Sequence, residues 1–185
     1  MSLLLRVCLF FLLIQSQLSW GQSGNFLFQP FFGYERVYHS QPSPYWQTRN
    51  NYGVRVLVGP QLLSLDGEYA MAKDDNLIGA TTVEHSSQKI KVGLRSTFNV
   101  SSYLGGFLRA GVQWKTEKRT ETTAGVPTES TENSTDPYAG AGVVIAYAKN
   151  LALTADVTAV FIDSHPNGRD VEYQYSAGLV VKFGQ

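Results

Sequence analysis

The sequence predicts an all-β protein whose eight antiparallel strands close into an up-and-down barrel. Three observations lead to this prediction. Hydrophobic residues recur at every second position in eight segments, as expected of strands whose two faces meet different surroundings. The connections between these segments alternate between long and short. Charged residues make up only 16% of the 185 residues, well below the roughly 25% of soluble globular domains.

The first 21 residues have the pattern of a secretory signal peptide. A basic residue precedes an unbroken apolar run of eight residues, and the small residues Ser19 and Gly21 precede a cleavage site. The apolar run is too short for a transmembrane helix, which needs about 20 residues. We expect residues 1–21 to be removed and residues 22–185 to form one domain. Cys8 lies in the leader, so the mature chain is expected to contain no cysteine.

The apolar faces of the eight segments follow one another along the chain. The opposite faces are polar or small, as Glu172, Gln174 and Lys182 illustrate in the last segment. Only the first segment is less regular, because Leu27 and Phe31 interrupt its polar face. In chain order the apolar faces consist of Phe26, Phe28, Phe32 and Tyr34; Tyr52, Val54, Val56 and Val58; Leu63, Leu65, Tyr69 and Met71; Ile90, Val92, Leu94 and Phe98; Leu104, Leu108, Ala110, Val112 and Trp114; Ala139, Ala141, Val143, Ile145 and Tyr147; Leu153, Ala155, Val157, Ala159 and Phe161; and Val171, Tyr173, Tyr175, Ala177, Leu179, Val181 and Phe183.

The lengths of the connections indicate which end of the barrel faces outward. Short turns on the periplasmic side and long loops outside are typical of transmembrane β-barrels. We therefore expect extracellular loops and two periplasmic termini. The longest connection is rich in Thr, Ser and Glu; its beginning is expected to continue the strand beyond the membrane, and its tip to be mobile. The expected long connections are residues 39–50, 72–82, 117–137 and 163–170, and the expected short turns are residues 59–61, 99–102 and 149–150.

Charged side chains on the polar strand faces predict a charge network inside the barrel. Both signs occur on these faces, and an eight-stranded barrel is just wide enough for its side chains to fill. Buried charges of opposite sign can pair there. With Lys89, seven bases and five acids share these faces, whereas Arg49 and Glu117 are assigned to the outer loops or their bases. The residues that we predict to form this lumenal network are Glu35, Arg55, Asp66, Glu68, Lys91, Arg95, Arg109, Lys115, Asp156, Glu172 and Lys182.

With these features the chain resembles the small eight-stranded outer-membrane barrels of the OmpA/OmpX type, over about residues 24–185. The most similar stretch is the C-terminal VEYQYSAGLVVKFGQ. The resemblance implies an environment of outer-membrane lipid and lipopolysaccharide in a Gram-negative cell envelope. It also implies that the last strand is read by the barrel-assembly machinery, although two further residues follow the final aromatic. The residues implied in that signal are Tyr175, Leu179, Val181 and Phe183.

The sequence offers little sign of catalysis, and we expect no enzymatic activity, cofactor or metal site. Each of the three histidines has a neighbouring serine, but adjacent residues on a strand point to opposite faces, so His85 and Ser86 could not easily act together. No metalloprotease motif or phosphate-binding loop is present. The balance of 15 basic and 15 acidic residues argues against a nucleic-acid partner.

Three functions remain open from the sequence. The first is an integral outer-membrane barrel with a structural or surface-interaction role, whose loops could meet an extracellular partner. The second is a soluble, secreted, lipocalin-like barrel that binds a small apolar ligand, although Gly33-Tyr34-Glu35 stands where the Gly-x-Trp motif of lipocalins is expected. The third is a pore, for which eight strands leave little room.

Overall fold

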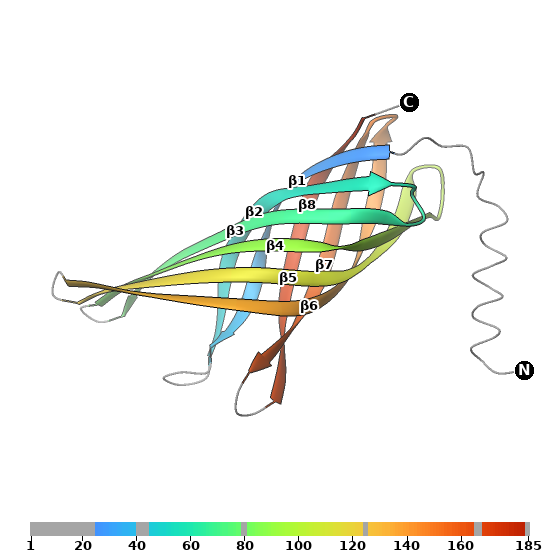
Figure 1. Ribbon diagram of the computed structural model, residues 1–185. Helices are drawn as coiled ribbons and strands as arrows, with labels where there is room; N and C mark the ends of the chain where they lie inside the picture. Colours follow the sequence, from blue (N-terminus) through green and yellow to red (C-terminus); the bar gives the residue numbers. More distant parts are fainter. Residues whose placement is uncertain (1–24, 40–44, 79–80, 124–125, 165–167, 184–185) are drawn as a thin grey trace, which may run out of the picture.

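The computed structural model describes residues 25–39, 45–78, 81–123, 126–164 and 168–183; the predicted leader lies outside them. Each strand pairs antiparallel with the next, and β1 pairs with β8, so the predicted eight-stranded up-and-down barrel is confirmed (Figure 1). Among the described residues there is no helix with the length and apolarity to span a membrane. The strands are β1 (Asn25–His39), β2 (Tyr45–Gly59), β3 (Ser64–Ile78), β4 (Thr81–Asn99), β5 (Leu104–Thr123), β6 (Val126–Ala148), β7 (Leu151–Ser164) and β8 (Gly168–Phe183).

The apolar faces of the strands point outward and the polar faces point into the lumen. On β4, Ile90 and Leu94 are 51% and 52% exposed, whereas Lys89 and Lys91 are 1% and 2% exposed. This distribution is the reverse of that in a soluble barrel. The exposed apolar side chains of the eight strands together form an apolar band around the barrel. On β5 this band ends at Trp114.

The strands are longer than the sequence pattern indicated. Pairing between β3 and β4 continues to Ile78 and Thr81, and pairing between β5 and β6 continues to Thr123 and Val126. The predicted loops at residues 72–82 and 117–137 are therefore wrong, because almost all of both segments is paired strand. The expectation that the beginning of the second segment continues the strand is confirmed, since β5 extends to Thr123. The tip of the second hairpin, residues 124–125, lies outside the described residues. At the other end, Leu63 belongs to a turn and not to β3.

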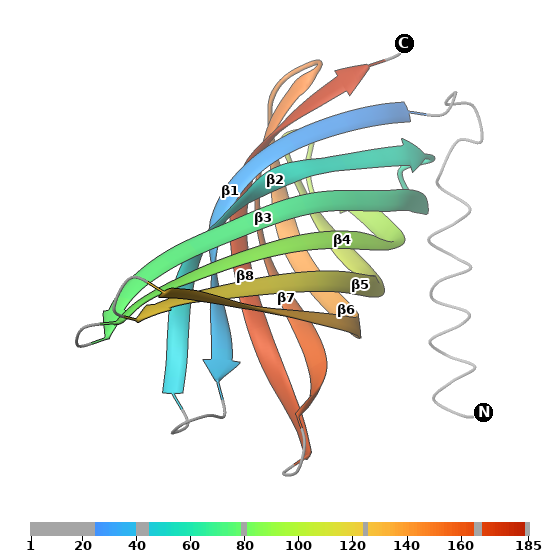
Figure 2. The same ribbon diagram turned by 60° about the vertical axis from the view of Figure 1, so that its left-hand side comes forward.

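Four strands continue past the barrel wall as a projecting sheet. β2 pairs with β3 only as far as Asn50 and Lys73, and β6 pairs with β7 only as far as Tyr138 and Val160. Beyond these points β3–β6 remain paired to one another and run away from the ends of the other four strands, on the side opposite the start of β1 and the end of β8 (Figures 1 and 2). We call residues 74–78, 81–88, 115–123 and 126–137 the projecting sheet.

Inside the barrel, glycines stand directly across from aromatic side chains on neighbouring strands. A Cβ atom at Gly142 would lie 2.4 Å from Cζ of Phe107, and one at Gly53 would lie 2.9 Å from Cζ of Phe31. Gly53 and Gly142 thus leave the space that a lumenal ring occupies, and a Cβ atom at Gly93 would lie 2.5 Å from the hydroxyl oxygen of Tyr138. Every such ring also lies beneath an arginine (Arg55, Arg95 or Arg109). The three cross-strand pairs are Phe31 with Gly53, Phe107 with Gly142, and Tyr138 with Gly111.

Replacing Gly111 by alanine is expected to lower the free energy of unfolding by about 1–3 kcal/mol, as other overpacked sites do. A Cβ atom there would lie 2.2 Å from the carbonyl oxygen of Val92 and 2.5 Å from the Cα of Gly93, so β4 and β5 would have to separate. Urea unfolding of the barrel in lipid vesicles measures the effect. Gly67→Ala is the matched control, because its nearest neighbour would lie 3.9 Å away. Equal midpoints for both variants would contradict the packing argument.

Candidate functional site in the barrel lumen

The middle of the lumen contains a cluster of buried charges centred on Glu68. The Oε2 atom of Glu68 lies 2.7 Å from Nη2 of Arg55 and 2.7 Å from Nη1 of Arg109, and its Oε1 lies 2.6 Å from Nζ of Lys91. These side chains come from β2, β3, β4 and β5 and are at most 2% exposed. The carboxylate of Glu68 therefore connects four consecutive strands through ion pairs.

Two further acids balance the arginines of this central cluster. Asp66 lies 3.3 Å from Nε of Arg109, and Asp156, on β7, lies 3.2 Å from Nη1 of Arg55. Ser176 donates a hydrogen bond of 2.7 Å to Asp156. Since Asp156 reaches Arg55 across the barrel, the cluster spans the lumen and blocks it.

A second cluster lies at the base of the projecting sheet and is built around Glu117. Its carboxylate lies 2.9 Å from Nη1 of Arg49 and 2.9 Å from Nζ of Lys115. Lys115 also approaches Glu172 at 3.5 Å. Glu117 follows Trp114 by three residues and so lies outside the apolar band. Burial acts to raise its pKa, but a hydrogen bond from His85 and the charges of Lys115 and Arg49 hold that pKa well below its usual range.

Glu35 joins the second cluster from β1. It forms an ion pair with Lys89 and lies 3.7 Å from Nε of Arg49, and all three side chains are at most 1% exposed. Arg49 thus links Glu35 on one side of the lumen to Glu117 on the other. The clusters around Glu68 and Glu117 together occupy the lumen from its middle to the projecting sheet.

Nine of the eleven residues predicted for the lumenal network take part in ion pairs. Arg95 and Lys182 do not: among the described residues, no carboxylate lies within 4.0 Å of either. Both lie at the end of the barrel with the short turns. The nine are Glu35, Arg55, Asp66, Glu68, Lys91, Arg109, Lys115, Asp156 and Glu172.

Arg49 and Glu117, which we assigned from sequence to the outer loops or their bases, belong to the charge network of the lumen. Arg49 is 1% exposed on β2, and Glu117 is directed inward from β5. Both lie in strand extensions that lack apolar alternation, so the hydrophobic pattern gave no signal for them. The alternation of side-chain direction along a strand does give a signal for Glu117. Glu117 lies two residues after Lys115 and four after Gln113, and both of these side chains face inward.

The four residues of the expected assembly signal lie together on the outward face of β8. Phe183 is 51% exposed and packs against Phe26 of β1, with ring centroids 5.9 Å apart. Leu179 and Tyr175 are 41% and 38% exposed, and Tyr175 stacks on Tyr34 at 4.9 Å. An aromatic pair therefore lies near each end of the β1–β8 pairing that closes the barrel.

The sequence of residues 18–183 matches the family model described as outer membrane protein beta-barrel domain. The chain belongs to this family. Membership agrees with the outward apolar band and places the protein in the outer membrane as an integral β-barrel. Of the two barrel types left open by the sequence, the outer-membrane barrel is thus the correct one. A comparison with curated protein sequences finds no match.

Solved structures with the same fold are small outer-membrane barrels. Neisserial surface protein A superposes with a TM-score of 0.65 at 15% identity, covering 88% of this chain and 100% of that one. Ail of Yersinia pestis, solved with the heparin analogue sucrose octasulfate, gives 0.58 at 12% identity over 88% and 100%. The N-terminal barrel domain of OprF from Pseudomonas aeruginosa gives 0.57 at 14% identity over 87% and 100%. At these identities the likeness is one of fold.

Proposed function

We propose that this outer-membrane barrel is a non-catalytic platform that holds the projecting sheet on the cell surface for interaction with an extracellular partner. The short turns and both termini then face the periplasm. The observation that carries the proposal is the continued pairing of β3–β6 beyond the apolar band, up to Thr123 and Val126. A paired sheet of four strands presents fixed side-chain positions, which a flexible loop does not.

The charge of the projecting sheet indicates what kind of partner it suits. Its segments contain eight acidic residues and three basic ones, so the sheet is net negative. Ail was solved with a sulfated ligand, but a surface of this sign favours a cationic or neutral partner over a polyanion. The free edge of β6 contains Pro127, Pro137, Glu129 and Glu132, and such edges resist addition of another strand. Contact through the faces of the sheet is therefore favoured.

The sealed lumen supports a structural role and not that of a pore. The clusters around Glu68 and Glu117 join side chains from seven strands across the lumen. A catalytic role for His85 with Ser86 is disfavoured by geometry: His85 is buried and directed to Glu117, whereas Ser86 lies on the opposite face. We further propose that lipopolysaccharide surrounds the outer part of the band and that the barrel-assembly machinery reads the outward residues of β8.

Cysteine labelling of intact cells tests the orientation. Because Cys8 is the only cysteine and lies in the predicted leader, an introduced cysteine would be unique in the mature chain. Thr131→Cys, on the projecting sheet, should react with a membrane-impermeant maleimide on intact cells. Tyr103→Cys, in a turn at the other end and 65% exposed, should react only after the outer membrane is permeabilised. The reverse pattern would overturn the proposed orientation.

A further inference from the structure

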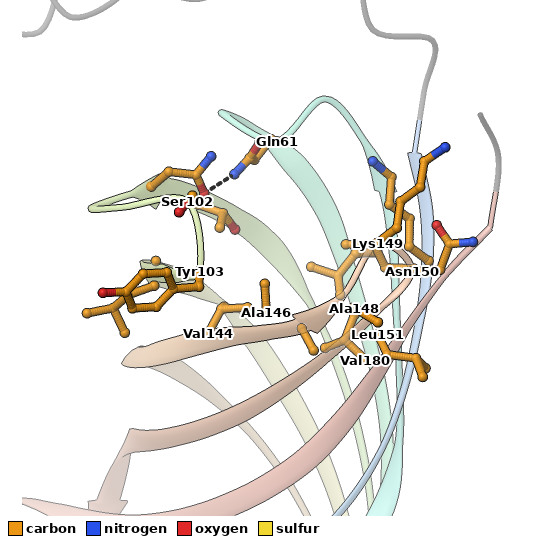
Figure 3. Close-up of a pocket in the computed structure, with 18 of the residues that line it drawn as sticks. Gln61, Ser102, Tyr103, Val144, Ala146, Ala148, Lys149, Asn150, Leu151 and Val180 are labelled. Carbon is orange, nitrogen blue, oxygen red and sulfur yellow. Dashed lines mark hydrogen bonds between the residues drawn. The ribbon is translucent and has the colours of Figure 1, made fainter.

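A cavity of about 400 Å³ lies at the end of the barrel with the short turns (Figure 3). The turns that contain Gln61, Ser102 and Lys149 surround it in Figure 3. Its volume is within the range of small-molecule binding sites. No side chain of the two ion-pair clusters lines it, so the cavity is separate from the sealed part of the lumen.

The wall of this cavity is mostly aliphatic, unlike the rest of the lumen. Leu57 and Val180 are 1% and 6% exposed and face inward, and Leu27, Val144 and Ala152 continue the same surface from three other strands. Elsewhere in the barrel the buried inward side chains are mainly charged or polar, with single apolar residues such as Val37 and Val160 among them, whereas at this end aliphatic side chains from five strands form one surface. Such a wall suits an alkyl chain.

A buried arginine without an acidic partner lies at this cavity. Arg95 is 2% exposed, and its guanidinium lies 3.6 Å from the centroid of the Phe107 ring. Its guanidinium donates hydrogen bonds to neutral groups, namely Oε1 of Gln29 and Oγ1 of Thr97, both at 3.3 Å. A buried guanidinium normally has a carboxylate or phosphate partner, because an uncompensated buried charge is unfavourable.

The excess positive charge of the lumen is concentrated at the same place. Six of the eight lumenal bases, with Arg49 counted among them, are in ion pairs, and the remaining two, Arg95 and Lys182, both line the cavity. Lys149 adds a third cation from a turn, and the cavity lining includes no acidic residue. The cavity therefore combines an aliphatic wall with uncompensated positive charge.

We propose that this cavity binds a single-chain alkyl anion, with its carboxylate or phosphate group at Arg95 and Lys182 and its alkyl chain against the aliphatic wall. Arginine matches the geometry of both anionic groups. Under the proposed orientation the site opens to the periplasm. It is independent of any partner of the projecting sheet, because it lies at the opposite end of the barrel.

Titration of the folded barrel in lipid nanodiscs tests the proposal, with Leu and Val methyl resonances as the readout. Decanoate or decyl phosphate should shift the methyl groups of Leu57 and Val180 saturably, and the tighter of the two identifies the head group. Acetate, which lacks the chain, and decyltrimethylammonium, which has the opposite charge, should not. Equal shifts with acetate and decanoate, or no shift with either alkyl anion, would overturn the proposal.

Two variants separate the contribution of the positive charge to binding from that of the aliphatic wall. Arg95→Gln should weaken decanoate binding about tenfold or more, as expected for loss of a charged hydrogen bond. Ala152→Phe should block binding by filling the cavity while leaving its charge intact. Lys118→Gln, an exposed position on the projecting sheet, removes the same charge and should bind normally. If Arg95→Gln fails to fold, Lys182→Gln replaces it. Unchanged affinity in both the charge variant and Ala152→Phe would place the alkyl anion elsewhere.

Discussion

The Glu68→Gln substitution is expected to lower the free energy of unfolding of the barrel by about 3–5 kcal/mol, the usual effect of removing one partner from a buried ion pair. Glutamine keeps the shape of the side chain but removes the charge that Arg55, Lys91 and Arg109 share. The three cations would then face one another in a closed lumen, with only Asp66 and Asp156 nearby.

Reversible urea unfolding in lipid vesicles, followed by tryptophan fluorescence, measures this change. Glu84→Gln is the matched control, because it makes the same chemical change at an exposed, outward position on β4. A surface substitution of this kind is expected to alter stability by no more than about 0.5 kcal/mol. If both variants unfold at the same urea concentration as the original protein, the central cluster does not hold the strands together.

The parts of the fold that could be predicted from sequence are those that cross the apolar band. There, each strand has one face in lipid and one in the lumen, and this contrast produces the alternation that locates it. Beyond Trp114 both faces of the strand are polar, so the alternation disappears although the strand continues to Thr123. The abundance of Thr in residues 116–135 was an available sign, because β-branched residues favour strands.

The lumenal residues were predictable by face, but their partners were not. Strand parity placed Glu68 and Arg109 inside, whereas their contact depends on how the strands are staggered around the barrel. Phe31 illustrates another limit: it looked like an irregularity of the first strand because it is apolar on a polar face. Its place in the lumen follows from Gly53 on the next strand and from Arg55, whose guanidinium lies 5.2 Å from the ring.

Leu94→Arg is expected to lower the free energy of unfolding by about 2–4 kcal/mol, as charges on the lipid face of a barrel do near the bilayer midplane. Leu94 is 52% exposed on the outward face of β4, midway between Ile90 and Phe98. Because these three side chains are all outward and apolar, the middle one should lie deepest in the lipid. Unfolding in vesicles is again the measurement, since detergent would solvate the new charge.

The depth dependence of this penalty distinguishes lipid exposure from ordinary packing. Val100→Arg makes a similar change in the turn after β4, where the side chain is 67% exposed. Near the membrane interface the penalty should fall to about 0–1 kcal/mol. A soluble barrel would tolerate both substitutions equally, because water solvates arginine at either exposed position. Equal stabilities of the two variants in vesicles would therefore contradict the placement of the apolar band in the bilayer. A difference of about 2 kcal/mol or more, which is about the gap between the midplane and interface penalties, would place Leu94 near the bilayer midplane.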